Sequence, residues 1–287
     1  MKLATFLHGG ETRIGTIDEA RGTARLLSGG PATMLDLIRR HEGPRGAAEP
    51  GGEEIPLAGV SLLAPIPRPS RNIFCVGKNY HEHAREFAQS GFDSSAAEVV
   101  PEVPIVFTKP PSAVIGPGAP IPHHLDPTDS VDYEGELTVV IGRGGRGIRR
   151  ADALRHVFGY TIINDVTART LQQTHRQWFI GKSMDGFCPM GPAIVTADEI
   201  PDPTSLRLRT HVNGELRQDA SVAQLIFDIP TLIETISAGI TLEPGDLIAT
   251  GTPVGVGIGF KPPKYLKPGD VVRIEVTGIG VLENPVA

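Results

Sequence analysis

Three acidic side chains lie where a folded chain could bring them together around a cation. Glu134 and Glu136 belong to the segment VDYEGELTVVIG and are separated by one glycine. Side chains alternate between the two faces of a strand, so a strand here places both carboxylates on one face, about 6–7 Å apart. Asp165 ends a second strand-like segment, GYTIIND. Hard divalent cations prefer carboxylate oxygens, and the three acids therefore predict a site for Mg²⁺, Mn²⁺ or Ca²⁺.

Each acid also has a simpler interpretation. Glu134 and Glu136 could form the exposed polar face of an antiparallel strand, and Asp165 could be the N-cap of a helix that starts in VTARTLQQ. The residues alone leave these alternatives open. If the acids do share one ion, an octahedral cation keeps about three positions for water or substrate, which predicts a catalytic site.

The segments that would position these acids are mostly short strands. The chain contains 34 Gly and 26 Pro among 287 residues, which favours many turns over long helices. Two helices are predicted, one in ADALRHV and one from about Pro230 to Gly239. Eight segments beyond residue 70 are typical of strands: NIFCVG, PIVFT, GELTVVIG, GYTIIND, AIVT, LRLRTHVNG, DLIAT and VVRIEVTG.

The first 68 residues predict a separate small α/β domain. LATFL and RIGTIDE are expected to be strands around a glycine turn, and ATMLDLIRRHEG a helix that ends near Gly43. A polar stretch rich in Gly, Pro and Glu follows up to Pro56, and then a short strand in GVSLLAP. The Pro-rich segment IPRPSR marks the boundary, so residues 69–287 form the second, mainly β domain.

Composition excludes several classes of protein. The net charge of −6, with acids and bases interspersed, does not suit a nucleic-acid or anionic membrane surface. Cys75 and Cys188 are the only cysteines and form no paired motif, which fits a reducing compartment. No apolar run reaches the length of a signal-peptide core or a membrane span. We therefore expect a soluble cytoplasmic protein with no nucleic-acid or membrane partner.

Eight motifs follow one another in the second domain: CVGKNYHEHAREF from Cys75, FTKP from Phe107, DYEGELTVVIG from Asp132, INDVTAR from Ile163, GKSMDGFCPMGP from Gly181, VNGELRQD from Val212, PGDLIATGTPVGVG from Pro244 and LKPGDVVRIEVTGIGVLENPV from Leu266. With these motifs, the chain from about Arg71 to Val286 resembles the fumarylacetoacetate hydrolase superfamily. The resemblance is greater to its smaller bacterial members, which include acylpyruvate hydrolases, oxaloacetate decarboxylases, and the isomerases and decarboxylases of homoprotocatechuate breakdown. It implies an α+β fold, with the mixed β-roll of that family's C-terminal domain and a small N-terminal α/β domain, assembled as a homodimer.

The resemblance assigns the three acids as ligands of Mg²⁺ or Mn²⁺, with Ca²⁺ as a further candidate. It also implies three catalytic residues. His83 and Glu86 match the H-x-x-E dyad, in which the carboxylate orients an imidazole that takes a proton from water. Lys182 would stabilise a developing enolate. Without the motif, His83 would be a structural histidine and Lys182 a surface lysine. The neighbouring His81 has the wrong spacing for the dyad and is interpreted as incidental.

Three further residues are implied to bind substrate. Arg169 and Gln172 follow Asp165 at i+4 and i+7, so a helix that starts there would show both on one face. The alternative is an ordinary solvated helix edge. Thr252, in TGTP, would hold a substrate oxygen or carboxylate, and its alternative is a polar residue in a turn.

The function implied is a metal-dependent hydrolase that cleaves a C–C bond in an acylpyruvate-like 2,4-dioxo acid and releases pyruvate enolate. Decarboxylation of oxaloacetate, or isomerisation of a 2-hydroxydienoate, would use the same site. All three reactions act on a small-molecule 2-oxo acid.

Two other classes compete with these enzymes. One is a non-catalytic metal-binding module, which would need neither the dyad nor the lysine. The other is a dinucleotide-binding protein, because GRGGRG from Gly142 matches G-x-G-x-x-G after a strand. That motif should open a helix at once, yet three residues, Ile148 to Arg150, intervene before ADALRHV, which favours a glycine-rich turn.

Overall fold

Among the residues that the computed structural model describes (1–27, 31–40, 50–91 and 99–287), the largest element is a 12-stranded mixed sheet. Two short strands, β5 (Ser61–Leu62) and β8 (Val114–Ile115), pair with β1 and β13 beside its main path. The order along that path is β4 (Pro50–Pro56), β3 (Thr23–Leu27), β2 (Glu11–Asp18), β1 (Lys2–His8), β13 (Cys188–Thr196), β11 (Val157–Asn164), β10 (Gly135–Ile141), β16 (Leu247–Ala249), β6 (Ile73–Gly77) and β7 (Ile105–Lys109).

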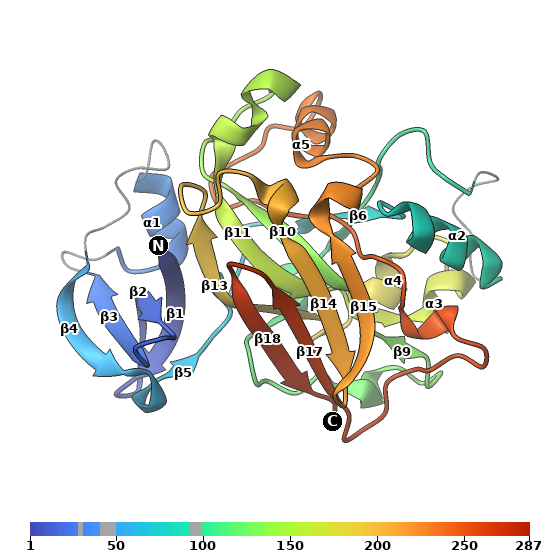
Figure 1. Cartoon of the computed structure of the whole chain (residues 1–287), viewed down its shortest axis with the longest axis horizontal. Coiled ribbons are helices and arrows are strands. Elements are labelled where there is room, and N and C mark those ends of the chain that lie inside the picture. Colours follow the sequence, from blue (N-terminus) through green and yellow to red (C-terminus); the bar gives the residue numbers. More distant parts are fainter. Residues whose placement is uncertain (28–30, 41–49, 92–98) are drawn as a thin grey trace.

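A second, antiparallel sheet lies across the first. In Figure 1 its strands, in orange and red, cross in front of β10, β11 and β13. Leu137 and Ile162 of the large sheet pack in one core with Leu208 and Ile274 of the second. The order of the second sheet is β15 (Glu215–Ser221), β14 (Arg207–Val212), β17 (Val271–Val276) and β18 (Gly280–Pro285).

The central strands β10 and β11 are buried on both faces, whereas β14 and β17 alternate between buried and more exposed residues. The reason is a second core on the opposite face of the large sheet. There Val140, Phe158 and Ile163 pack with Leu37 and Ile38 of α1. Strands that are covered on both faces have nearly continuous apolar sequences, and β10 and β11 show this pattern.

Five α-helices are found in the described part of the chain, and none of them is long and apolar enough to cross a membrane. The predicted helix near Pro230 is confirmed: Asp228 caps it by accepting a hydrogen bond from the backbone N–H of Thr231 at 2.9 Å. Figure 1 shows α2, α3 and α4 on the side of the molecule away from the N-terminal strands. The helices are α1 (Met34–Arg40), α2 (His81–Gln89), α3 (Arg169–Thr174), α4 (Phe179–Lys182) and α5 (Ile229–Ser237).

The N-terminal segment shares a sheet with the rest of the chain. β1 pairs with β13 in antiparallel register, Lys2 opposite Val195 and Leu3 opposite Ile194. The stretch that was expected to be irregular up to Pro56 includes strand β4, while residues 41–49 lie outside the described part. Hydrogen bonding therefore continues across the predicted boundary near residue 68, and the division into two domains stays a prediction.

Two expectations about local structure were wrong. VDYEGELTVVIG is not one strand, because β9 (Val131–Asp132) pairs with β12 (Thr167–Ala168) before β10 begins to pair with β11. ADALRHV forms a 3₁₀ helix, Arg150–His156, the type common in short connections.

The GRGGRG segment also opens no α-helix. It packs on the end of α5, where the carbonyl and the hydroxyl of Ser237 accept hydrogen bonds from the backbone N–H groups of Gly147 and Ile148 at 2.6 and 3.0 Å. The segment therefore lacks the helix that a dinucleotide-binding motif opens, in agreement with the glycine-rich turn that the sequence favours.

The core between the sheets should dominate stability. Ile162 is fully buried at the centre of β11, so Ile162→Ala removes packed methyl groups and leaves a cavity. We expect it to lower the free energy of unfolding by about 2–5 kcal/mol in urea denaturation. Ile240→Ala is the matched control, since Ile240 is 47% exposed and should change stability by less than about 0.5 kcal/mol. Similar losses in the two variants would contradict this assignment of the core.

Candidate active site

The three acids of the sequence pattern converge in the structure. Glu134, Glu136 and Asp165 each offer a carboxylate oxygen, and these oxygens lie within 4.8 Å of one another. The strands hold them there: the backbone N–H of Asp165 donates to the carbonyl of Glu134 at 2.8 Å, across the start of the β10–β11 pair. The alternative of an exposed polar face is wrong, because the three side chains are only 5, 1 and 0% exposed. Asp165 is also not a helix cap, since β12 follows it and α3 begins at Arg169.

Basic side chains surround the carboxylates. The Nζ of Lys182 bridges Glu134 and Asp165 with two contacts of 2.7 Å. Behind them, the Nζ of Lys109 donates to Asp165 at 2.6 Å and to the carbonyl of Val166 at 3.0 Å. Both lysines are buried, so the expectation of a surface lysine at 182 is wrong. Ion pairs this deep are retained only where each charge has close partners, and these have them.

The environment separates the pKa values of the two glutamates. Burial raises the pKa of Glu134, but the nearby charges of Lys182 and Arg169 outweigh it and hold this pKa well below its ordinary value. Burial raises the pKa of Glu136 well above its ordinary value, and the charges of Asp165 and Glu134 raise it further. Burial lowers the pKa of Lys182, but the charges of Asp165 and Glu134 more than reverse this shift. The two carboxylates therefore favour the protonated, positively charged form of Lys182.

Glu136 is the member of the cluster that a bound cation would compensate. The ion pairs of Lys109, Lys182 and Arg169 go to Asp165, Glu134 and Asp132 rather than to Glu136, whose carboxylate accepts a hydrogen bond from the backbone N–H of Gly251 at 2.8 Å. Three buried carboxylates, one of them outside these ion pairs, are a donor set that fits Mg²⁺ or Mn²⁺.

The predicted dyad lies on α2. Helical spacing brings Nδ1 of His83 to 3.1 Å from Glu86, whose carboxylate also accepts from the backbone N–H of Gly255 at 3.0 Å. His83 is buried and lines the same pocket as the carboxylate cluster. His81, on the same helix, is exposed and lines a different cavity, in agreement with its interpretation as incidental.

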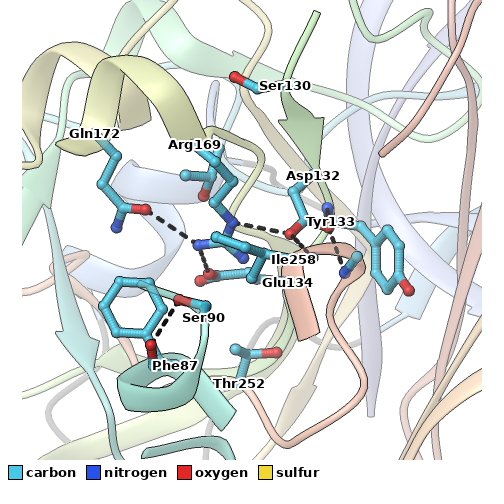
Figure 2. A network of polar contacts seen from close by, with 12 residues as sticks. Phe87, Ser90, Ser130, Asp132, Tyr133, Glu134, Arg169, Gln172, Thr252 and Ile258 are labelled. Carbon is cyan, nitrogen blue, oxygen red and sulfur yellow. Dashed lines mark hydrogen bonds and ion pairs between the residues drawn. The ribbon is translucent and has the colours of Figure 1, made fainter. Parts of the chain in front are cut away.

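Arg169 and Gln172 turn inward at the start of α3, as Figure 2 shows. The guanidinium contacts Glu134 at 2.7 Å and Gln172 at 3.2 Å, and its Nε donates to Asp132 at 2.8 Å. Both residues are buried, so the solvated helix edge is wrong; the helix itself starts four residues later than expected. Within the described chain the Nη2 of Arg169 has no hydrogen-bond partner, which leaves a buried donor for a ligand.

Thr252 lies beside the cluster with its hydroxyl already in use. It donates to the carbonyl of Gly135 at 3.0 Å and accepts from Nε2 of Gln218 at 2.7 Å. Its side chain lines the pocket, but its hydroxyl proton already forms a hydrogen bond with the backbone of β10, the strand that carries Glu136. A role in binding substrate stays a prediction.

The pocket over these residues is a narrow cavity of about 10 Å³. An aromatic wall bounds it: the ring of Trp178 meets those of Phe107 and Phe87 edge-on, at centroid distances of 5.3 and 6.1 Å. Gly77 makes room for the indole, since a Cβ there would lie 2.3 Å from it. Pattern analysis did not assign Trp178, Lys109 or Asp132 to the site, although the FTKP and DYEGEL motifs contain two of them.

The raised pKa of Glu136 gives a prediction for metal binding. A carboxyl group with a raised pKa keeps its proton to higher pH, and a cation must displace that proton. Binding of Mn²⁺ should therefore release protons and weaken as the pH falls. Titration calorimetry in two buffers of different ionisation enthalpy measures the release, and Glu136→Gln should remove it. Equal heats in both buffers would contradict this assignment.

Two family models and several known proteins match this chain. The family model described as fumarylacetoacetate (FAA) hydrolase C-terminal matches residues 72–287, and a model described as Rv2993c-like, N-terminal, matches residues 1–65. The oxaloacetate tautomerase YisK of Bacillus subtilis is 54% identical over 230 residues, which cover 80% of this chain and 74% of that protein.

Two solved structures match this chain over its whole length, and each match covers 99% of the other protein's chain. One is a fumarylacetoacetate hydrolase from Exiguobacterium antarcticum, 44% identical with a TM-score of 0.86. The other is maleylpyruvate hydrolase from Sphingobium sp. SYK-6 in complex with manganese(II) and pyruvate, 36% identical with a TM-score of 0.80. The expected α+β fold, with its mixed β-roll and small N-terminal α/β part, is confirmed. The chain belongs to the fumarylacetoacetate hydrolase family.

Proposed function

We propose that this protein is a divalent-metal-dependent enzyme that interconverts the enol and keto forms of a small 2-oxo dicarboxylic acid of the oxaloacetate type. One observation carries the proposal: His83, oriented by Glu86, lines the same small pocket as the carboxylate cluster and Lys182. A proton-transfer group, a site for a cation and a fixed positive charge are what an enolisation needs. The relative named oxaloacetate tautomerase supports this substrate class.

The charged residues would hold the substrate. A divalent cation bound by Glu134, Glu136 and Asp165, Mg²⁺ or Mn²⁺ with Ca²⁺ as a further candidate, would polarise the 2-oxo group as a Lewis acid. The ammonium of Lys182 stabilises negative charge on the enol oxygen, because its raised pKa keeps it protonated. Arg169 offers Nη2 to a substrate carboxylate, and Gln172 lies beside it.

His83 would move the proton. When Nδ1–H donates to Glu86, the neutral imidazole leaves Nε2 free to accept a proton. In the direction from enol to keto, His83 takes the proton of the 2-hydroxyl, the C2–O bond becomes the double bond of the 2-oxo group, and the C2–C3 double bond becomes a single bond. The electron pair released from that double bond then takes a proton from the imidazolium at C3. Atoms and charges balance without water or a co-reactant.

Hydrolysis of an acylpyruvate is the second candidate. The contact of His83 with Glu86 also suits the activation of a water, which would attack the distal carbonyl and release pyruvate enolate. The maleylpyruvate hydrolase with bound pyruvate supports it. We place it second because the tautomerase relative has the higher identity, 54% against 36%. Decarboxylation of oxaloacetate and isomerisation of a 2-hydroxydienoate would use the same residues.

We further propose a homodimer that acts in the cytoplasm. Strand β7 ends the main path of the large sheet, and Val106 on it is exposed, as are Phe179 and Ile180 on the adjacent α4. An open strand edge beside exposed apolar residues suits a second copy of the chain. Both cysteines are free and buried, in keeping with a reducing compartment.

The tautomerase proposal is tested with chelator-stripped protein to which Mg²⁺ or Mn²⁺ is returned. We expect the metal to restore the decay of enol-oxaloacetate, followed by its ultraviolet absorbance. His83→Asn should lower kcat by about 10²–10⁴-fold, because the proton-transfer group is lost. His81→Asn is the matched control on the exposed side of the same helix and should leave the rate unchanged. Unaltered decay with His83→Asn would refute the proposed role of this residue.

A second measurement separates tautomerisation from hydrolysis. Acetylpyruvate is offered to the Mn²⁺-loaded protein, and pyruvate release is coupled to lactate dehydrogenase. We expect kcat/KM for hydrolysis to be at least about tenfold below that for enol-oxaloacetate, because the tautomerase relative shares more of this sequence than the hydrolase does. The opposite ranking would make the hydrolase the better assignment.

A further inference from the structure

Two carboxylates from distant parts of the chain bind one short loop. The loop is GVGIG, residues 255–259. Glu86 of α2 accepts a hydrogen bond from the backbone N–H of Gly255 at 3.0 Å. Asp132 accepts from the N–H groups of Gly257 and Ile258 at 2.7 and 3.0 Å. The loop therefore anchors the dyad carboxylate on one side and a fully buried aspartate on the other.

Glycines allow both carboxylates to come this close. A Cβ on Gly257 would lie 2.6 Å from an oxygen of Asp132, and a Cβ on Gly259 would lie 2.0 Å from an oxygen of Glu86. Neither glycine adopts a positive φ, so alanine adds no backbone strain at either position. An alanine at 259 would meet Glu86 first, whereas the Cβ of an alanine at 257 would also lie 2.4 Å from the backbone carbonyl oxygen of Lys264.

Asp132 also holds the arginine of the pocket. Its second oxygen accepts from Nε of Arg169 at 2.8 Å, a contact drawn in Figure 2 beside that to Ile258. The same guanidinium contacts Glu134 at 2.7 Å and lines the pocket, whereas Asp132 is behind it and does not line the pocket. Four donors converge on this carboxylate, the fourth being the backbone N–H of Tyr133 at 2.8 Å.

We propose that Asp132 is a positioning residue that couples the seating of Glu86, and through it His83, to the orientation of Arg169. One rigid carboxylate fixes both the loop that receives α2 and the guanidinium that faces the substrate. The imidazole of His83 and the guanidinium of Arg169 are thereby held in fixed positions relative to each other, although they lie on different helices, α2 and α3. The role of this coupling in turnover rests on the function proposed above, while the coupling itself is a property of the fold.

Asp132→Asn tests the proposal because it replaces one carboxylate oxygen by an amide nitrogen, which cannot accept hydrogen bonds. The one remaining oxygen cannot serve all four donors, so the hydrogen bonds from the N–H of Ile258 and Nε of Arg169 cannot be kept together with the other two. Asp246→Asn is the matched control. Asp246 is also buried, accepts from Nε of Arg71 and from the backbone N–H of Glu243, both at 2.7 Å, and contacts neither the loop nor Arg169. A purely structural effect of losing a buried carboxylate would appear in both variants.

We expect Asp132→Asn in the Mn²⁺-loaded full chain to raise KM and to lower kcat for enol-oxaloacetate, each by about tenfold or more. Amide hydrogen exchange in α2 should increase, because Glu86 loses its fixed anchor. Asp246→Asn should change none of these three quantities. Wild-type values of KM, kcat and α2 exchange in Asp132→Asn would overturn the proposal, whatever its melting temperature.

Two alanine variants separate the parts of the coupling. Gly259→Ala displaces only Glu86, so kcat should fall while KM changes little. Combined with Asp132→Asn, its effect on kcat should be smaller than the product of the single effects, because both act on the seating of Glu86. Losses that multiply would overturn the coupling. If Asp132→Asn does not fold, Gly257→Ala replaces it, since that Cβ separates the loop from Asp132.

The exchange measurement also separates this inference from the proposed function. If the wild-type protein turns over no 2-oxo acid, the assigned reaction fails, but α2 must still exchange faster in Asp132→Asn than in Asp246→Asn. Equal α2 exchange in these two variants would overturn the coupling even if the enzyme is an active tautomerase.

Discussion

The burial of three carboxylates whose oxygens lie within 4.8 Å of one another is the constraint on which the rest of this structure depends. Like charges so close in a low dielectric repel strongly unless cations compensate them. Lys182, Lys109 and Arg169 supply part of that compensation from three different elements. The two sheets hold the acids in place, and the remaining negative charge, centred on Glu136, is the charge that the proposed divalent ion would compensate.

Much of this site could be predicted from strand periodicity and motif order. Alternation placed Glu134 and Glu136 together, helical spacing paired His83 with Glu86, and the end of a strand located Asp165. Such patterns report which face of an element a residue occupies, but not what packs against that face. The buried state of Lys109, the contact between Asp132 and the loop at 255–259, and the wall formed by Trp178 depend on pairings between segments up to 126 residues apart.

The errors in the fold have similar causes. The interruption at Tyr133 and Glu134 arises because the strand changes its partner, from β12 to β11, which no local pattern reports. Strand β4 was missed because its glycines and glutamates lack strand propensity, and its pairing with β3 outweighs this. A sequence boundary at a proline-rich segment also gave no sign that β1 joins β13 of the larger sheet.

The single tryptophan of the chain has a practical consequence. Trp178 lies between Phe107 of the edge strand and Phe87 of α2, within the wall of the pocket. Its emission depends on the polarity and motion of this one place, with no second indole to add background. The protein therefore carries a built-in optical probe, with which compounds can be screened for occupancy of the pocket whether or not they are turned over.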